Sequence, residues 1–201
     1  MADWILDPAG TGRLKQSATF AALQSSGLSL EECAPCGRLM LRARPPVEET
    51  RSRIARATGI DLPVEPNTAG RGAYPALWTG PGRWLINVHP TDAPEIADRI
   101  GSALQVSTFH LADINHARIV FNASGPLAPE LLSRLCPLDL DEKIFGTGRC
   151  AQSLLARIPM LLHRVGDVPA YHLYVDRSLA HYAWDWLTDA AATIAKQGDA
   201  P

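Results

Sequence analysis

Apolar positions recur along the chain with two periods, one typical of strands and one typical of helices. Alternating or continuous short apolar runs predict strands, and apolar residues spaced three or four positions apart predict helices. The predicted strands cover residues 38–44, 74–79, 83–88, 106–114, 117–122, 150–158, 160–165 and 171–175, and the predicted helices cover residues 46–58, 93–104, 126–135 and 178–196. This order predicts an α+β fold of two split β-α-β (ferredoxin-like) modules with antiparallel sheets.

Turn and cap residues support several of these boundaries. Pro46 stands at the expected first turn of a helix, where its missing N–H costs nothing. The Gly80-Pro81-Gly82 string between two apolar runs predicts a hairpin. Asp92, three residues before Glu95, predicts a side-chain N-cap for the second helix.

The domain organisation follows from where the periodicity becomes clear. Residues 1–36 are weakly patterned and are interpreted as an N-terminal extension, in which residues 1–30 become ordered on a partner. Residues 37–201 form a single domain, with modules at roughly 37–114 and 115–197. Trp4 and Phe20 are the expected anchors of the extension, because aromatic side chains bury much area for few rotatable bonds.

The last predicted helix carries one apolar stripe and one aromatic residue beside it. The stripe consists of Leu179, Tyr182, Ala183, Trp186, Leu187, Ala190 and Ile194. Trp184 lies to the side of this stripe, where it either covers the core or joins a partner, and Arg177 precedes it. Since Trp and Arg are enriched in interface hot spots, both residues are candidates for a subunit interface.

Composition narrows the classes of function. The 201 residues suit one domain, and 46% hydrophobic with 20% charged residues is ordinary for a globular protein. A net charge of −2 argues against a nucleic-acid partner, which would require a basic face. We expect a cytoplasmic protein without membrane association, because the chain shows neither a leader pattern nor a run of 18 apolar residues.

Short motifs give little support for chemistry in this chain. Two Gly-x-Gly strings begin at Gly10 and Gly146, but neither has the third glycine or the strand-to-helix setting of a dinucleotide site. Cys33 and Cys36 have a redox-type spacing, yet neighbouring glutamates disfavour a thiolate and no second cysteine pair completes a zinc site. We therefore expect no metal and no cofactor in this chain.

Several strings in order resemble one known family. They are Leu77-Trp78-Thr79-Gly80-Pro81-Gly82-Arg83-Trp84-Leu85, Asp113-Ile114-Asn115-His116-Ala117-Arg118, Ser124-Gly125-Pro126, Leu131 to Leu140, Gly148-Arg149-Cys150-Ala151-Gln152 and Tyr171 to Ser178. Together they resemble the gamma-subunit family of heterotetrameric sarcosine oxidases over roughly residues 37–195.

The resemblance implies a fold, partners and a reaction. The fold would be that of the folate-binding part of glycine-cleavage aminomethyltransferases. The partners would be alpha, beta and delta subunits, which would hold FAD, FMN, NAD, zinc and tetrahydrofolate. The complex would oxidatively demethylate sarcosine to glycine, pass the methyl carbon to tetrahydrofolate and form hydrogen peroxide.

The site residues of the aminomethyltransferases carry over only in part. Asp139 matches the position of an acid that faces the folate there, but Leu138 precedes it and the following glycine-rich acidic stretch has no counterpart. Asp113 and His116 match a turn motif, with Asn115 in place of serine. We therefore expect a non-catalytic accessory subunit. The alternatives are a subunit of an oxidoreductase for another N-methyl amine, such as N-methylglutamate, or a stand-alone folate-binding protein.

Overall fold

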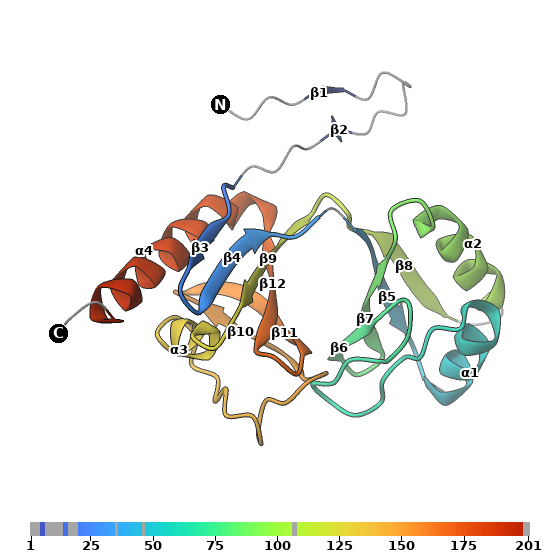
Figure 1. Ribbon diagram of the computed structural model, residues 1–201. Helices are drawn as coiled ribbons and strands as arrows, with labels where there is room; N and C mark the ends of the chain where they lie inside the picture. The colour runs from blue at the N-terminus through green and yellow to red at the C-terminus, as the bar shows by residue number, and fades with distance from the viewer. Residues whose placement is uncertain are drawn as a thin grey trace.

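Two antiparallel sheets with helices on their outer sides make up the fold (Figure 1). A computed structural model describes residues 5–6, 14–15, 20–34, 36–45, 47–105 and 108–198. The α+β class and the antiparallel sheets are as predicted.

The first module follows the predicted split β-α-β order. Its elements are β5 (Gly37–Ala43), α1 (Val47–Thr58), β6 (Ala76–Gly80), β7 (Arg83–Val88), α2 (Ala93–Ala103) and β8 (Phe109–Asp113). The strands pair in the order β6-β7-β5-β8, and every pairing is antiparallel. Helices α1 and α2 cover the outer face of this sheet (Figure 1).

The second module has a larger sheet with a different strand order. Its elements are β9 (Arg118–Ser124), α3 (Ala128–Ser133), β10 (Cys150–Leu155), β11 (Ile158–Gly166), β12 (Ala170–Asp176), the 3-10 turn η1 (Arg177–Leu179) and α4 (Ala180–Gly198). The sheet runs β10-β11-β12-β9-β4-β3, so β9 pairs with β12 rather than lying between β11 and β12. This module therefore differs from the first both in element sequence, which is β-α-β-β-β-α instead of β-α-β-β-α-β, and in strand order.

Part of the expected N-terminal extension belongs to this sheet. Strands β3 (Leu23–Ser25) and β4 (Leu28–Glu32) form a hairpin, and β4 pairs with β9. The expected boundary after residue 36 therefore does not coincide with a boundary in the fold. The apolar alternation that places β4 in the core consists of Leu28 and Leu30 alone, which is too short to stand out in the sequence. Strands β1 (Ile5–Leu6) and β2 (Leu14–Lys15) pair with each other in a separate two-stranded sheet.

The side chain of Asp92 does not cap α2, which corrects one prediction. The helix begins after Asp92, but the Asp92 carboxylate makes no capping hydrogen bond. It accepts hydrogen bonds from the Tyr74 hydroxyl at 2.6 Å and from the Thr91 hydroxyl at 2.8 Å. The Asp92 carboxylate therefore binds two hydroxyl groups instead of the backbone N–H groups of the helix. One of these hydroxyls belongs to a residue 18 positions away in the chain.

The buried face of α4 is also shifted from the predicted stripe. Ala180, Ala183, Leu187, Ala190, Ala191 and Ile194 are buried. Tyr182 and Trp186, which belong to the predicted stripe, are 38% and 43% exposed and lie against each other with ring centroids 6.2 Å apart. The helix packs mainly small alanine side chains against the sheet. The larger side chains of Tyr182 and Trp186 therefore lie outside the surface between helix and sheet.

Apolar side chains gather in three clusters. One lies between the six-stranded sheet and helices α3 and α4, and the second lies between the four-stranded sheet and helices α1 and α2. The third lies between the two sheets and contains Leu77, Leu85, Val120, Cys150, Leu161 and Tyr174. Within the described residues, no helix is long and apolar enough to cross a membrane.

Candidate functional site

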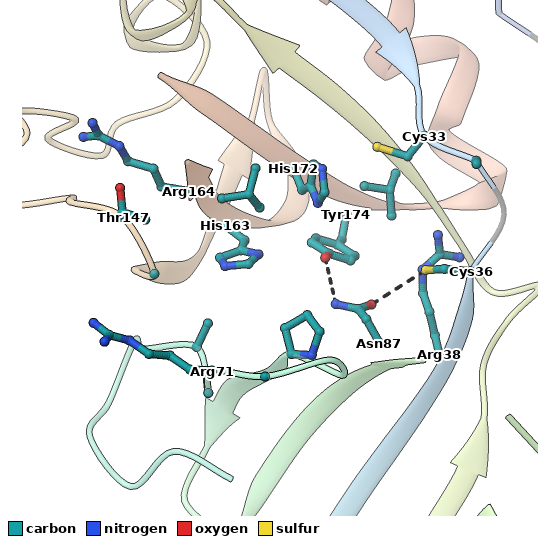
Figure 2. Close-up of a pocket in the computed structure, with 18 of the residues that line it drawn as sticks. Cys33, Cys36, Arg38, Arg71, Asn87, Thr147, His163, Arg164, His172 and Tyr174 are labelled. Atoms are coloured by element: carbon teal, nitrogen blue, oxygen red, sulfur yellow. Dashed lines mark hydrogen bonds between the residues drawn. The ribbon is translucent and has the colours of Figure 1, made fainter. Parts of the chain in front are cut away.

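A cavity of about 680 Å³ lies between the two sheets, beside the third apolar cluster. We call it the inter-sheet cavity. Strands β5 and β7 of the smaller sheet supply Arg38 and Asn87, and strands β11 and β12 of the larger sheet supply His163, His172 and Tyr174. Figure 2 shows these side chains converging on one space from both sheets. Its volume lies in the range typical of small-molecule sites.

Arg38 brings a buried positive charge to this cavity. Its side chain is 3% exposed, and its Nη1 donates to the carbonyl oxygens of Asn115 at 3.4 Å and Arg118 at 3.1 Å. Its Nε has no hydrogen-bond partner in the described part of the chain. The backbone N–H of Arg38 donates to the side-chain oxygen of Asn115, which ties β5 to the turn before β9.

Asn87 and Tyr174 join the two sheets inside the cavity. The Asn87 side-chain amide donates to the Tyr174 hydroxyl at 2.9 Å, and the Cys36 thiol lies 3.9 Å from the Asn87 side-chain oxygen (Figure 2). Burial raises the pKa of Tyr174 well above its usual range, so its hydroxyl stays protonated. Since the hydroxyl accepts from Asn87, its own proton is available to another acceptor.

The two histidines of the cavity are uncharged at neutral pH. Burial, with a smaller contribution from His172, lowers the pKa of His163 to about 4. Burial and the nearby Arg38 guanidinium lower the pKa of His172. The two rings meet edge to face with centroids 6.3 Å apart, and His163 Nδ1 has no partner among the described residues.

Cys33 and Cys36 stand at the cavity as neutral thiols. Burial and the carboxylate of Glu31 raise the pKa of Cys33 to about 12, and burial raises the pKa of Cys36. Both cysteines are free in the structure. A protonated thiol is neither a good nucleophile nor a metal ligand, and no group of three or more His, Cys, Asp or Glu side chains suited to a metal ion occurs in the described ranges.

The other end of the cavity carries paired groups. The Thr147 hydroxyl donates to the Gly166 carbonyl at 3.0 Å and lies 3.1 Å from the Asp167 carboxylate. The buried Arg164 guanidinium donates to Glu142 at 2.9 Å and to the Phe145 carbonyl at 3.0 Å. The charge of Arg164 at this end is therefore already paired within the chain.

Asp139 lies away from the inter-sheet cavity. It is exposed beside a smaller cavity of about 370 Å³, and its carboxylate accepts the backbone N–H of Asp141 at 3.0 Å. The Asp113 carboxylate likewise accepts the backbone N–H of Asn115 at 2.9 Å, so these acids stabilise turns.

The structure places three of the four interface candidates. Phe20 is 7% exposed, with its ring centroid 5.3 Å from that of the half-buried Trp184. Arg177 donates from Nε to the His116 carbonyl at 2.8 Å. Trp4 lies outside the described residues.

The sequence alone did not predict that the polar side chains of the inter-sheet cavity would line one space. Arg38, Asn87, His163, His172 and Tyr174 come from four strands separated by up to 136 positions. The available signal was a polar residue at the end of an apolar run within a strand, such as Arg38 before Leu39-Met40-Leu41 or His163 after Met160-Leu161-Leu162.

Comparison with known proteins decides the family. A family model described as "Sarcosine oxidase, gamma subunit family" matches residues 48–193. The chain belongs to the sarcosine oxidase gamma subunit family. The sarcosine oxidase subunit gamma of Corynebacterium sp. (strain U-96) is 31% identical over 179 residues, which cover 87% of this chain and 85% of that protein. The subunit gamma of Arthrobacter sp. is 32% identical over 151 residues, covering 71% and 72%.

Solved structures agree with membership of this gamma subunit family. A chain of the heterotetrameric sarcosine oxidase from Corynebacterium sp. U-96, solved with pyrrole 2-carboxylate, matches with a TM-score of 0.77 at 29% identity, covering 84% of this chain and 85% of that one. The glycine cleavage system aminomethyltransferase T from Bartonella henselae matches with a TM-score of 0.60 at 10% identity, covering 80% and 45%. The second likeness concerns the fold alone, and it confirms the predicted aminomethyltransferase-like fold.

Proposed function

We propose that this chain is the gamma subunit of a heterotetrameric sarcosine oxidase. The observation that carries the proposal is the match over 84% of the chain, with a TM-score of 0.77, to a chain of an enzyme of that name. The family match over residues 48–193 supports it independently of the structure. The partners would be alpha, beta and delta subunits, and the complex would work in the cytoplasm.

The reaction of the complex would be the oxidative demethylation of sarcosine. Glycine and hydrogen peroxide would be the products, and the methyl carbon would pass to tetrahydrofolate. FAD, FMN, NAD, zinc and tetrahydrofolate would be held by the partner subunits. A non-catalytic role for this chain is supported by its cavity, in which Cys33 is a protonated thiol and His163 and His172 are poor proton acceptors near neutral pH.

The interface would include the surface around η1 and the start of α4. Trp184 is partly exposed there and Arg177 lies at the same end of the helix. Phe20 would act by holding Trp184 in place, and Trp4 would contribute from the N-terminal segment. The exposed pair of Tyr182 and Trp186 adds apolar area to this helix surface.

Co-expression tests the assignment. A tagged copy of this chain should recover three other subunits in equal amounts, and the purified complex should oxidise sarcosine. A complex of the other three subunits with full activity, together with recovery of this chain as a lone monomer, would contradict the proposal.

The identity of the amine needs its own measurement. Flavin reduction in the complex is compared for sarcosine and N-methylglutamate at equal concentrations. We expect reduction by sarcosine; reduction by N-methylglutamate alone would keep the subunit role and change the substrate.

A further inference from the structure

The Arg38 guanidinium is a buried cation for which the described residues supply no ion-pair partner. It is 3% exposed, and no described carboxylate forms an ion pair with it. Two backbone carbonyls accept from Nη1, while Nε–H has no acceptor in the described chain. Burying a charge in this way is unfavourable unless an anion compensates it. The buried Arg38 charge would therefore be stabilised by an anion from outside the described chain.

The rest of the deep lining carries no opposing charge. His163 and His172 are neutral because burial lowers their pKa values, and the Cys33 and Cys36 thiols are protonated because burial raises theirs. Asp167, the carboxylate among the described lining residues, lies at the far end beside Thr147. Among the described lining residues, an anion at Arg38 would therefore meet no carboxylate close by, and it would displace no internal ion pair.

The walls are suited to an apolar body. Val120, Pro75 and Val165 line the space, and the aromatic side chains of Tyr174 and His172 project into it (Figure 2). A cavity of about 680 Å³ holds a small organic molecule rather than a single inorganic ion. We propose that the inter-sheet cavity binds a small organic monocarboxylate, with its carboxylate at Arg38 and its apolar body between the two sheets.

One neutral group, the Tyr174 hydroxyl, would complete recognition. The Tyr174 hydroxyl accepts from Asn87 at 2.9 Å and keeps its own proton to donate. This proton can bind a carboxylate oxygen or a second polar atom of the ligand. The site thus offers one charge-assisted contact and one neutral donor, both held by strands rather than by loops.

The test measures a matched pair of fluorinated probes on the full chain. 4-Fluorobenzoate and 4-fluorobenzamide have nearly the same shape and differ in charge, and their binding is followed by fluorine NMR. We expect saturable binding of the carboxylate and binding of the amide that is weaker by about tenfold or more, since one charge-assisted contact is lost. Arg38→Gln should weaken carboxylate binding by a similar factor.

Two further variants separate a lost site from a lost fold. Arg42→Gln removes the same charge from an exposed position of the same strand and should bind as the wild type. Ala34→Trp obstructs the cavity at an exposed lining residue, keeps Arg38 and should also weaken binding. If Arg38→Gln does not fold, Ala34→Trp decides the question.

Three results would overturn the site: no saturable binding of 4-fluorobenzoate, equal binding of the amide, or wild-type binding by a folded Arg38→Gln or Ala34→Trp. Because the chain is measured alone, these results leave the subunit assignment untouched. Failure of the chain to join a complex would, in turn, leave the cavity proposal standing.

Discussion

Trp184 offers a sharp test of how α4 is held on the larger sheet. Its ring centroid lies 5.3 Å from that of Phe20 and 5.1 Å from that of Phe121, and the Phe20 and Phe121 rings meet edge to face at 5.1 Å. This aromatic cluster joins α4, the segment before β3 and the central strand β9. The change Trp184→Ala therefore removes contacts among three segments that are distant in sequence.

The expected loss follows from the burial of the side chain. Replacing a fully buried Phe or Trp by Ala costs about 3–5 kcal/mol, and the partial exposure of Trp184 reduces the expected loss to about 2–3 kcal/mol. For a chain of 201 residues, this corresponds to a melting temperature lower by about 5–10 °C. The transition should stay cooperative, because the remaining core clusters are intact.

Urea unfolding of the isolated chain, followed by circular dichroism, measures this loss. Trp186→Ala is the matched control, because Trp186 lies two residues further along the same helix and is 43% exposed. The control should change the free energy of unfolding by less than about 0.5 kcal/mol, as substitutions on the surface usually do.

Three outcomes would refute this reasoning. If Trp184→Ala unfolds like the wild type, the aromatic cluster does not stabilise the chain. If it unfolds like the wild type and also fails to join the complex, Trp184 acts at the subunit interface rather than in the core. A larger loss for Trp186→Ala than for Trp184→Ala would show that the buried face of α4 is assigned wrongly.

Three further predictions concern the cavity and the turns. The pKa of His163 is about 4 in the folded chain and about 6.5 in the unfolded chain. As the pH falls, the unfolded chain therefore binds the proton first. The free energy of unfolding should drop by about 3 kcal/mol between pH 6.5 and 4. His163→Gln should remove that part of the pH dependence in urea titrations, and an unchanged difference between the two pH values would contradict it. Gly82→Ala should destabilise by several times the ~1 kcal/mol usual for a point change, because φ is +64° and a Cβ would overlap a backbone carbonyl of β5, whereas Gly101→Ala has open space in α2 and should be neutral or stabilising. The double change of Cys33 and Cys36 to Ser should leave sarcosine oxidation by the complex intact, and loss of activity or of bound zinc would revive a metal role.

From Gly37 onward, local patterns were sufficient for the elements and their order. The hairpin around Gly80-Pro81-Gly82, the helix after Pro46 and the three strands from Cys150 onward lie where apolar periodicity and turn residues predicted them. Each of these features depends on residues within a few positions of one another, so the sequence carries the information directly. The family resemblance was also visible in the order of short strings, and the matches over residues 48–193 confirm it.

Pairings between distant segments were decided only by the tertiary structure. Strand β4 is short and joins β9 about 90 positions later, where Asn122 donates to Glu31 at 3.0 Å. Both faces of β11 are buried, because one belongs to the cluster beneath helices α3 and α4 and the other to the cluster between the two sheets. A strand that is buried on both faces lacks the alternation of apolar and polar residues that would show which side chains point toward which layer.

The inter-sheet cavity is the clearest case of information that local patterns do not contain. Arg38, Asn87, His163 and Tyr174 are polar residues in largely apolar strands. The sequence of a strand does not show which sheet lies opposite it. Packing of the two sheets decides which of these groups meet, and it also excludes the water that would otherwise set their pKa values. The charge left on Arg38 and the neutrality of the imidazoles therefore arise from the tertiary structure, although every residue involved is present in the sequence.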